Sequence, residues 1–265
     1  MPEGDTVFRA AAALHAALVG ATIDAVAGSH PEVLRHGQRI SGRIVTSVAS
    51  TGKHLLVRFD NGWTLRTHLG MPGRWRIEAA GGPWSRTPGA ARVVLEAGRV
   101  RAVCYAAPTV QIAPDHIVAS AVAHLGVDAT ADHVDEGEAL RRANALPEAT
   151  TVSKAITDQS VVAGVGNVFK NEILFLERLH PGTPIGMLDT SQVVRLVGRA
   201  HRLLLANRTG PVRTTTGDPR RGRRHWVYGR DGRQCLRCGA AILSGWVAGR
   251  ITYWCPRCQP EPVSS

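Results

Sequence analysis

The sequence is poor in several residue types, and each shortage narrows the class of protein. Aromatic residues make up only 5% of the 265 residues, and lysine occurs three times against 29 arginines. No run of 18 or more apolar residues occurs, so no segment is a candidate transmembrane helix. The start, MPEGDTVFRA, also lacks the charged and then apolar pattern of a signal peptide. We therefore expect a cytoplasmic protein with no membrane partner.

Acidic residues are also in deficit, and the deficit is local. Lys and Arg total 32 against 21 Asp and Glu, which gives a net charge of +11. Residues 1–190 hold 18 basic and 18 acidic side chains, whereas residues 191–260 hold 14 Arg against Asp218 and Asp231. A solvated basic face would by itself explain such a run. Because aromatic residues and a metal-ligand pattern lie beside it, we expect a polyanion as the partner.

The first part of the chain has the pattern of one helix followed by strands. Residues 40–105 alternate or run apolar between Gly-rich and Pro-rich turns, which predicts an antiparallel β domain. An amphipathic helix is predicted before it, ending near Gly20, because four apolar residues share the spacing of one helix face. These are Val7, Ala11, Leu14 and Leu18.

From about residue 115 the apolar period becomes helical and the local charge acidic. Helices are predicted at residues 134–145, 151–160, 167–179 and 190–207, the last with a buried stripe of Val193, Leu196, Val197, Ala200 and Leu204. Residues 209–233 have no period, and they predict a mobile basic loop that either links two modules or follows phosphates. We therefore expect domains at residues 1–115, 130–210 and 225–260.

Four of the five cysteines lie close together near the C-terminus. The pattern Cys235-x2-Cys238-x16-Cys255-x2-Cys258 is the spacing of a zinc ribbon with four thiolate ligands. Four protein ligands leave no open position for water, so we expect one structural Zn²⁺ that folds a small module and does no chemistry. Cys104 is left over and is expected to be a small core residue.

The N-terminus carries a second chemical signal. Removal of Met1 would leave the secondary amine of Pro2 at the positive end of a helix, which disfavours its protonated form. A neutral secondary amine attacks an aldehyde-level carbon to give an iminium, an electron sink that needs no organic cofactor. Glu3 beside it could move protons. The alternative is that Pro-Glu is simply a good helix start.

Three further positions combine weak signals. In a chain that prefers Arg, Lys53 is a candidate for a role that needs an ammonium, with a plain surface residue as the alternative. Gly164 and Gly166 lead into a helix near Asn167, so backbone N–H groups and the Asn167 amide could face an anion. Arg250 lies beside Gly249 at the tip of a predicted hairpin and is either a phosphate contact or a surface arginine.

Taken together and in this order, these motifs resemble the formamidopyrimidine-DNA glycosylase and endonuclease VIII family of base-excision repair enzymes. The resemblance covers nearly the whole chain, from the PEG start through TGKHLL, HLGMPGRW and DQSVVAGVGNVFKNEIL to YWCPRCQ. It implies an α+β protein with an N-terminal antiparallel β-sandwich, a helical helix-two-turn-helix domain and the zinc ribbon. The implied partner is damaged DNA, bound by a monomer in the bacterial nucleoid.

The resemblance also implies roles for single residues. Pro2 would attack C1′ of the damaged nucleotide and form a Schiff base, Glu3 would shuttle protons, and Lys53 would donate a proton and contact phosphate. Arg250 would contact phosphate and assist a second elimination. Asn167 and Lys154 would contact DNA near the lesion, and Met71 would fill the gap left by the flipped base.

The branch within the family follows from two segments. PEGD at the start resembles endonuclease VIII, and residues 103–112 lack the DPRRFG motif of the purine-directed branch, so oxidised pyrimidines are the expected substrates. Met71 between Gly70 and Pro72 would be the only wedge, which predicts a preference for single-stranded or open DNA. The alternatives are an oxidised-purine glycosylase and a non-catalytic zinc protein that binds damaged DNA.

Overall fold

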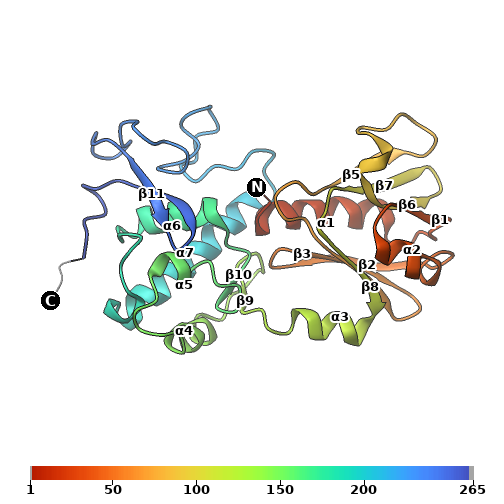
Figure 1. The fold of residues 1–265 in the computed structure, drawn as a ribbon, viewed down its shortest axis with the longest axis horizontal. Coiled ribbons are helices and arrows are strands. Elements are labelled where there is room, and N and C mark those ends of the chain that lie inside the picture. The colour runs from red at the N-terminus through yellow and green to blue at the C-terminus, as the bar shows by residue number, and fades with distance from the viewer. Residues whose placement is uncertain (1, 263–265) are drawn as a thin grey trace. The chain divides into compact units, whose positions relative to one another are not determined.

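The computed structural model describes residues 2–262, so Met1 lies outside the described residues. The chain divides into two compact units, residues 1–124 and 125–265, which are described separately below (Figure 1). No helix within the described part of the chain is long and apolar enough to cross a membrane.

The first unit is a sandwich of two four-stranded antiparallel sheets, as the family resemblance implies. One sheet has the order β1 (Ala25–Ala27), β6 (Ala91–Ala97), β7 (Val100–Tyr105) and β5 (Arg74–Ala79). The other has the order β2 (Val45–Thr51), β3 (His54–Phe59), β4 (Trp63–His68) and β8 (Thr109–Pro114). Three helices accompany them: α1 (Gly4–Leu18), α2 (Pro31–His36) and α3 (Asp115–Val122), with short 3-10 turns at Gly37–Arg39 and Pro88–Ala90.

Both sheets and α1 contribute to one apolar core. The predicted stripe of α1 is confirmed, because its four apolar residues are all buried. Leu55 and Leu65 of one sheet and Leu95 of the other belong to the same buried cluster. Burying each such side chain contributes about 1.5–3 kcal/mol. Cys104 is fully buried in this core, as expected, and burial raises the pKa of its thiol.

The direction of α1 places its first residue at one end of the sandwich. The backbone N–H of Gly20 donates to the carbonyl of Val45 at 2.9 Å, and His15 Nδ1 lies 3.1 Å from the carbonyl of Val48. The helix therefore runs antiparallel to β2. Residue 2 lies 13 positions before His15, about 20 Å at the rise of an α-helix. Thr51, where β2 ends, lies about 10 Å beyond Val48 at the rise of a strand, so Pro2 reaches the end of the unit where β2 turns into β3.

The second unit contains the helices and the cysteine ribbon. Its helices are α4 (Glu136–Asn144), α5 (Val152–Ala155), α6 (Asn167–Leu176) and α7 (Thr190–Asn207), with a 3-10 turn at Ile185–Met187. Two short strands, β9 (Val127–Asp128) and β10 (Val162–Ala163), pair in parallel, and β11 (Leu243–Val247) and β12 (Arg250–Trp254) form a hairpin. All five residues of the predicted α7 stripe are buried, and Asp189 caps this helix with a capping box.

Two helix predictions were too long. The predicted helix at 151–160 ends at Ala155, because Asp158 Oδ1 accepts hydrogen bonds from the backbone N–H and the hydroxyl of Ser160 and so favours a turn. The predicted helix at 167–179 ends at Leu176, because Arg178 takes a left-handed backbone conformation with a φ of 57°. Apolar periodicity continued through both ends, so the pattern alone did not mark them.

The predicted loop at residues 209–233 is confirmed, and the structure adds contacts that the sequence did not predict. The segment has no helix or strand (Figure 1), but a buried carboxylate within α6 organises it. Glu172 accepts hydrogen bonds from the backbone N–H groups of Trp226, Val227 and Tyr228 at 2.7–3.0 Å and from the Thr215 hydroxyl. The loop is therefore fixed by polar contacts that a search for apolar periodicity does not detect.

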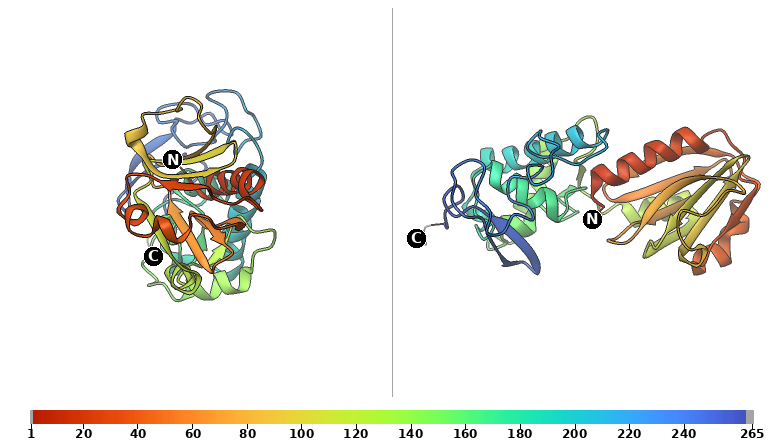
Figure 2. Two further views of the ribbon diagram at one scale, coloured as in Figure 1. Left: turned by 90° about the vertical axis from the view of Figure 1, so that its right-hand side faces the viewer. Right: turned by 90° about the horizontal axis from the view of Figure 1, so that it is seen from above.

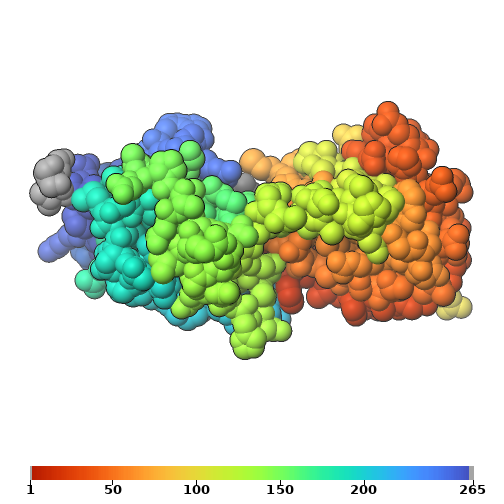
Figure 3. Space-filling model, turned by 90° about the horizontal axis from the view of Figure 1, so that it is seen from below, coloured from red at the N-terminus to blue at the C-terminus, as the bar shows by residue number. Residues whose placement is uncertain are grey.

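The acidic and basic parts of the second unit lie on opposite sides of it. In both Figure 1 and the left view of Figure 2, α4 lies at the bottom of this unit and the loops of residues 209–233 lie at the top. Figure 3 shows the green segment that contains α4 as exposed surface. Asp132 and Asp135, just before this helix, and Glu136, its first residue, are all exposed. The basic segment therefore has a face of its own.

Candidate active site and nucleic-acid interface

The start of the first unit places Pro2 and Glu3 directly before α1. Pro2 is half-buried and Glu3 is fully buried, with an extended backbone at the N-cap position. The carbonyl of Glu3 accepts the backbone N–H groups of Thr6 and Val7, both at 3.0 Å, which fixes the first helical turn. A prolyl nitrogen next to a buried carboxyl group, at the positive end of a 15-residue helix, is an arrangement suited to amine chemistry.

Lys53 belongs to the tight turn between β2 and β3 at this same end of the unit. Thr51 and His54 are paired across the turn, and Gly52 supplies the positive φ of 55° that the turn requires. Since α1 begins at this end, the structure brings Pro2, Glu3 and Lys53 to one region of the first unit.

Two histidines that sequence reasoning missed lie beside Lys53. His54 and His68 are paired in register on β3 and β4, with ring centroids 5.0 Å apart. Burial, followed by the neighbouring His68 and Arg66, lowers the pKa of His54 to about 3; burial and then Lys53 lower that of His68. Both rings are therefore neutral at pH 7. The motifs TGKHLL and HLGMPG already contained these histidines, and only the strand register connects them.

The loop that carries Met71 follows β4 directly. Met71 is 75% exposed, whereas Gly70 and Gly73 beside it have no room for a side chain. A Cβ on Gly70 would lie 2.7 Å from the Pro108 side chain, and one on Gly73 would lie 2.2 Å from the carbonyl oxygen of Leu69. The tip is therefore a rigid loop that presents one flexible apolar side chain. Pro108, in the turn between β7 and β8, lies against it.

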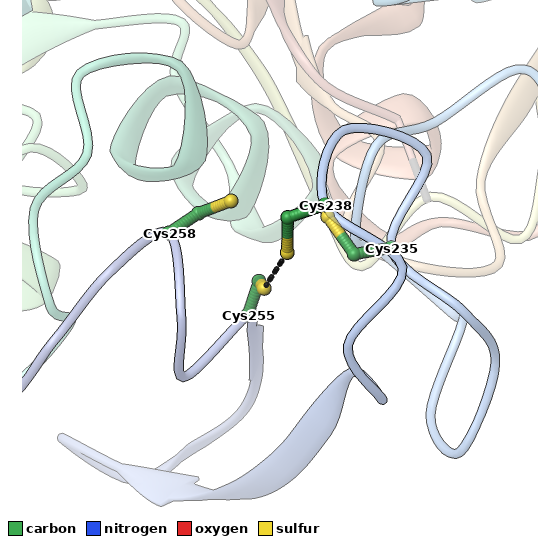
Figure 4. A group of neighbouring side chains, drawn as sticks. All are labelled: Cys235, Cys238, Cys255 and Cys258. Atoms are coloured by element: carbon green, nitrogen blue, oxygen red, sulfur yellow. Dashed lines mark hydrogen bonds between the residues drawn. The ribbon is translucent and has the colours of Figure 1, made fainter.

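The four cysteines of the second unit form one cluster (Figure 4). Their sulfurs all lie within 4.8 Å of one another, and the Sγ atoms of Cys238 and Cys255 are 3.5 Å apart. A tetrahedral zinc ion with Zn–S bonds of about 2.3 Å separates its sulfurs by about 3.8 Å, so the arrangement fits one zinc ion with four thiolate ligands. All four are free cysteines.

The hairpin next to this cluster presents Arg250 at its tip. Val247 and Arg250 are paired across a two-residue turn whose residues, Ala248 and Gly249, both have positive φ angles of 49° and 72°. Arg250 is exposed, whereas Thr252 two residues further on is fully buried. The turn geometry explains the glycine next to the arginine.

Arg250 and Lys154 line one pocket of about 210 Å³. Lys170 also lines it, and its Nζ donates to the Thr252 hydroxyl at 2.7 Å. The Ser153 hydroxyl is buried there with no hydrogen-bond partner among residues 2–262. Asp158 also lines the pocket, with its Oδ1 accepting hydrogen bonds from Ser160. Three cationic side chains against this one carboxylate, with one unsatisfied hydroxyl, suit a phosphate group. Lys170, buried within α6, was missed because nothing in the local sequence marks its side chain as buried.

Asn167, at the start of α6, has a partner that was not expected. Its amide nitrogen donates to the carbonyl of Ile251 in β12 at 3.0 Å, and its Oδ1 is buried without a partner among the described residues. Asn171, one turn later, accepts the backbone N–H of Tyr253 at 2.6 Å. Asn167 therefore ties the helix to the hairpin, in addition to any anion contact by its second amide hydrogen.

These features define a class of protein with two units, one with Pro2, a buried carboxyl group and a lysine at one end, the other with a four-cysteine cluster and arginine-rich surfaces. Comparison with known proteins then narrows the class. Residues 1–108 match the family model of the formamidopyrimidine-DNA glycosylase N-terminal domain, and residues 125–211 match that of its H2TH domain.

Two curated relatives cover almost the whole chain. The probable endonuclease 8 2 of Streptomyces coelicolor is 41% identical, over 99% of this chain and 95% of its own length. The DNA-(apurinic or apyrimidinic site) lyase Nei2 of Mycolicibacterium smegmatis is 40% identical, over 98% of this chain and 99% of its own. The chain belongs to the formamidopyrimidine-DNA glycosylase and endonuclease VIII family, in its endonuclease VIII-like branch.

A solved structure supports the fold. The formamidopyrimidine-DNA glycosylase of Lactococcus lactis, crystallised with DNA that contains an abasic site, is similar with a TM-score of 0.84. It is 21% identical, and the alignment covers 98% of this chain and 100% of that one. The predicted fold class is confirmed: a β-sandwich, a helical H2TH unit and a four-cysteine cluster.

Proposed function

We propose that this chain is a DNA glycosylase and apurinic/apyrimidinic lyase that removes oxidised bases, mainly pyrimidines, from DNA. The observation that carries the proposal is the placement of Pro2, Glu3 and Lys53 at one end of the sandwich, in a chain whose relatives are named endonuclease 8 and Nei2. The nucleophile is the amine of Pro2, which is available only after Met1 has been removed.

The reaction follows from the chemistry of a secondary amine. The Pro2 nitrogen attacks C1′ of the damaged nucleotide, the bond between C1′ and the base breaks, and the base leaves with a proton. Opening of the sugar ring gives an iminium, which acidifies the proton on C2′. Loss of that proton breaks the bond between C3′ and its oxygen and cuts the strand; a further elimination would release the 5′ side. Glu3 moves protons at the sugar, and Lys53 supplies a proton and contacts phosphate.

The second unit holds the DNA. The pocket with Lys154 and Arg250 takes a phosphate near the lesion, and Arg250 assists the second elimination. Asn167, which ties α6 to the hairpin, adds a further contact. The four cysteines hold one structural zinc ion, which fixes the ribbon and leaves no open coordination position. No organic cofactor is needed. We propose that the protein acts as a monomer on DNA in the cytoplasm.

The preference for pyrimidines, and for open DNA, is supported by the region around Met71. The turn of residues 106–108, which lies against this loop through Pro108, carries only two alanines and the proline, where the purine-directed branch has Arg and Phe. Met71 would therefore be the only side chain that fills the gap left by the flipped base. We expect faster excision of an oxidised pyrimidine from a bubble than from paired duplex, and faster excision from duplex would contradict this.

Borohydride trapping tests the activity itself. With a 5,6-dihydrouracil or abasic oligonucleotide, the protein processed to Pro2 should give a covalent adduct, and the double variant Pro2→Gly, Glu3→Gln should lose at least about 10²-fold of it. An undiminished adduct in the variant would contradict the assigned residues. A wild-type protein that binds damaged DNA but gives no adduct would instead be a non-catalytic binding protein, and faster excision of 8-oxoguanine would favour the purine branch.

A further inference from the structure

A second, larger pocket lies in the basic segment that the proposed reaction does not use. It has a volume of about 500 Å³ and is formed between residues 221 and 233. Its lining contains no carboxylate. The side chains with polar or aromatic groups that line it are Arg221, Arg224, His225, Tyr228, Arg230 and Arg233.

The walls of this pocket are fixed by Glu172. One oxygen of its carboxylate accepts the backbone N–H of Trp226 and the Thr215 hydroxyl, and the other accepts the N–H groups of Val227 and Tyr228. The hydrogen bonds of this buried carboxylate therefore go to three backbone N–H groups and one hydroxyl. It holds the chain that carries His225 and Tyr228, and it does not form an ion pair with an arginine of the pocket.

Arg230 brings a charge into the pocket wall, and its hydrogen bonds go to neutral carbonyl groups. It is 8% exposed, and its terminal nitrogens donate to the carbonyls of Gly222, His225 and Gln234 at 2.8–3.3 Å. Its Nε is buried with no hydrogen-bond partner within residues 2–262, and the same holds for Nε2 of His225. The carboxylate of Glu172 offsets part of the charge on Arg230 and His225. The lining holds four arginines, so one carboxylate behind the wall leaves a positive field in the pocket.

Two exposed arginines complete the lining. Arg221 and Arg233 are both exposed, and across the described chain neither has a carboxylate within 4.0 Å. Tyr228 and His225 stand edge to face, with ring centroids 5.6 Å apart. Like charges gathered without acids repel one another, and a bound anion relieves that repulsion. The volume lies within the range of about 300–1,000 Å³ found for small-molecule sites, which exceeds the need of a lone phosphate.

We propose that this pocket is a second phosphate-binding site that takes a nucleotide of the bound DNA strand. The phosphate contacts Arg221 and Arg233, and the sugar or base lies against Tyr228 and His225. This inference rests on the proposed function, since it takes DNA as the substrate. The site shares no lining residue with the pocket of Lys154 and Arg250 and would bind a different phosphate.

The salt dependence of DNA binding tests this site. Fluorescence anisotropy with a labelled duplex that carries an abasic-site analogue would be measured between about 50 and 200 mM salt. For the double variant Arg221→Ala, Arg233→Ala we expect the slope of log K against log salt to become shallower by about 1–2, because each lost phosphate contact removes about 0.9. The affinity near 0.1 M salt should fall by about 5–30-fold.

A matched variant controls for net charge. Arg86 and Arg99 of the first unit are also exposed and have no carboxylate within 4.0 Å in the described chain, so Arg86→Ala, Arg99→Ala removes the same charge elsewhere. It should keep the wild-type slope within about 0.5. An equal slope for the pocket variant and the wild type would overturn the proposal, as would an equal loss in both double variants.

Two further arms separate the other outcomes. If deoxynucleoside monophosphate raises the melting temperature of the wild type but not of the pocket variant, while both have the same DNA slope, the site takes a free nucleotide and the DNA assignment is wrong. Borohydride trapping of the pocket variant at saturating abasic DNA should equal that of the wild type. Absence of the adduct in the wild type would refute the proposed function and leave the slope measurement interpretable.

Discussion

The two units are stabilised in different ways. The first unit is an apolar sandwich in which α1 and both sheets share one core, and its candidate chemistry lies at one end, at Pro2. In the second unit, α6 carries four buried polar residues, Asn167, Lys170, Asn171 and Glu172, each bonded to the ribbon or to the basic loop. The comparison teaches that the proposed reacting groups lie on an apolar frame, whereas the proposed DNA-binding surface depends on buried polar contacts and on the four-cysteine cluster.

Loss of the metal site should give the largest difference between the units. Cys238→Ser removes one of four ligands, and zinc binding supplies about 10–16 kcal/mol to the folding of small structural zinc modules. We expect loss of bound zinc and a fall of at least about 100-fold in DNA affinity, with the sandwich intact. Zinc content, anisotropy and hydrogen exchange resolved by segment would measure this. Cys104→Ser, in the first unit, should keep its zinc; retained zinc and binding in Cys238→Ser would contradict the comparison.

Removal of single cationic side chains should give an intermediate effect confined to binding. Arg250→Ala and Lys154→Ala each remove a charge-assisted contact, for which we expect about a 10-fold loss of DNA affinity and slower strand cleavage. The melting temperature should change by less than about 2 °C, because both side chains are exposed. Calorimetry and single-turnover cleavage would check this. A large drop in melting temperature for Arg250→Ala would mean that the residue is structural.

Acid sensitivity of the first unit should be the smallest effect. Burial, His68, Arg66, His124 and Lys53 lower the pKa of His54 to about 3. The unfolded chain therefore binds more protons than the folded chain below about pH 6.5, so this contribution to stability is complete above pH 6.5 and is lost as the pH falls toward 3.

We expect His54→Gln to reduce the drop in melting temperature between about pH 7.5 and 5 by about 2–4 °C. His116→Gln is the matched control in the same unit, since the His116 side chain is exposed. Thermal unfolding followed at both pH values would measure the difference. Identical falls in melting temperature for the wild type and His54→Gln would show that the burial of His54 does not contribute to the acid sensitivity.

The sequence predicted the elements whose signal is local. The stripes of α1 and α7, the strands β2 to β7 within residues 40–105 and the clustering of the four cysteines follow from local patterns, and each is confirmed. The strands β1 and β8 lie outside the predicted range and were missed. The early end of α5 was missed, because it depends on an Asp158 side-chain turn rather than on apolar spacing. Glu172 was also missed, because its hydrogen-bond partners lie more than 40 residues away in the sequence. Nothing near Glu172 in the sequence indicates that its carboxylate is buried and accepts these bonds.

The candidate site was predictable to a similar degree. The residues at Pro2, Lys53 and Arg250 could be chosen from the chain, because their motifs are local. His54 and His68 lie together through strand register, and Lys154 lies with Arg250 through the docking of a hairpin more than 90 residues later. Such neighbours follow from tertiary packing, which no local pattern in one sequence specifies.

The central claim is that the chemistry starts at the amine of Pro2, and mass spectrometry of the trapped complex tests it most directly. After borohydride reduction on an abasic oligonucleotide and digestion of protein and DNA, the sugar remnant should be found on the N-terminal peptide that begins with Pro2. A remnant on Lys53 or Lys154, with an unmodified Pro2, would contradict the account.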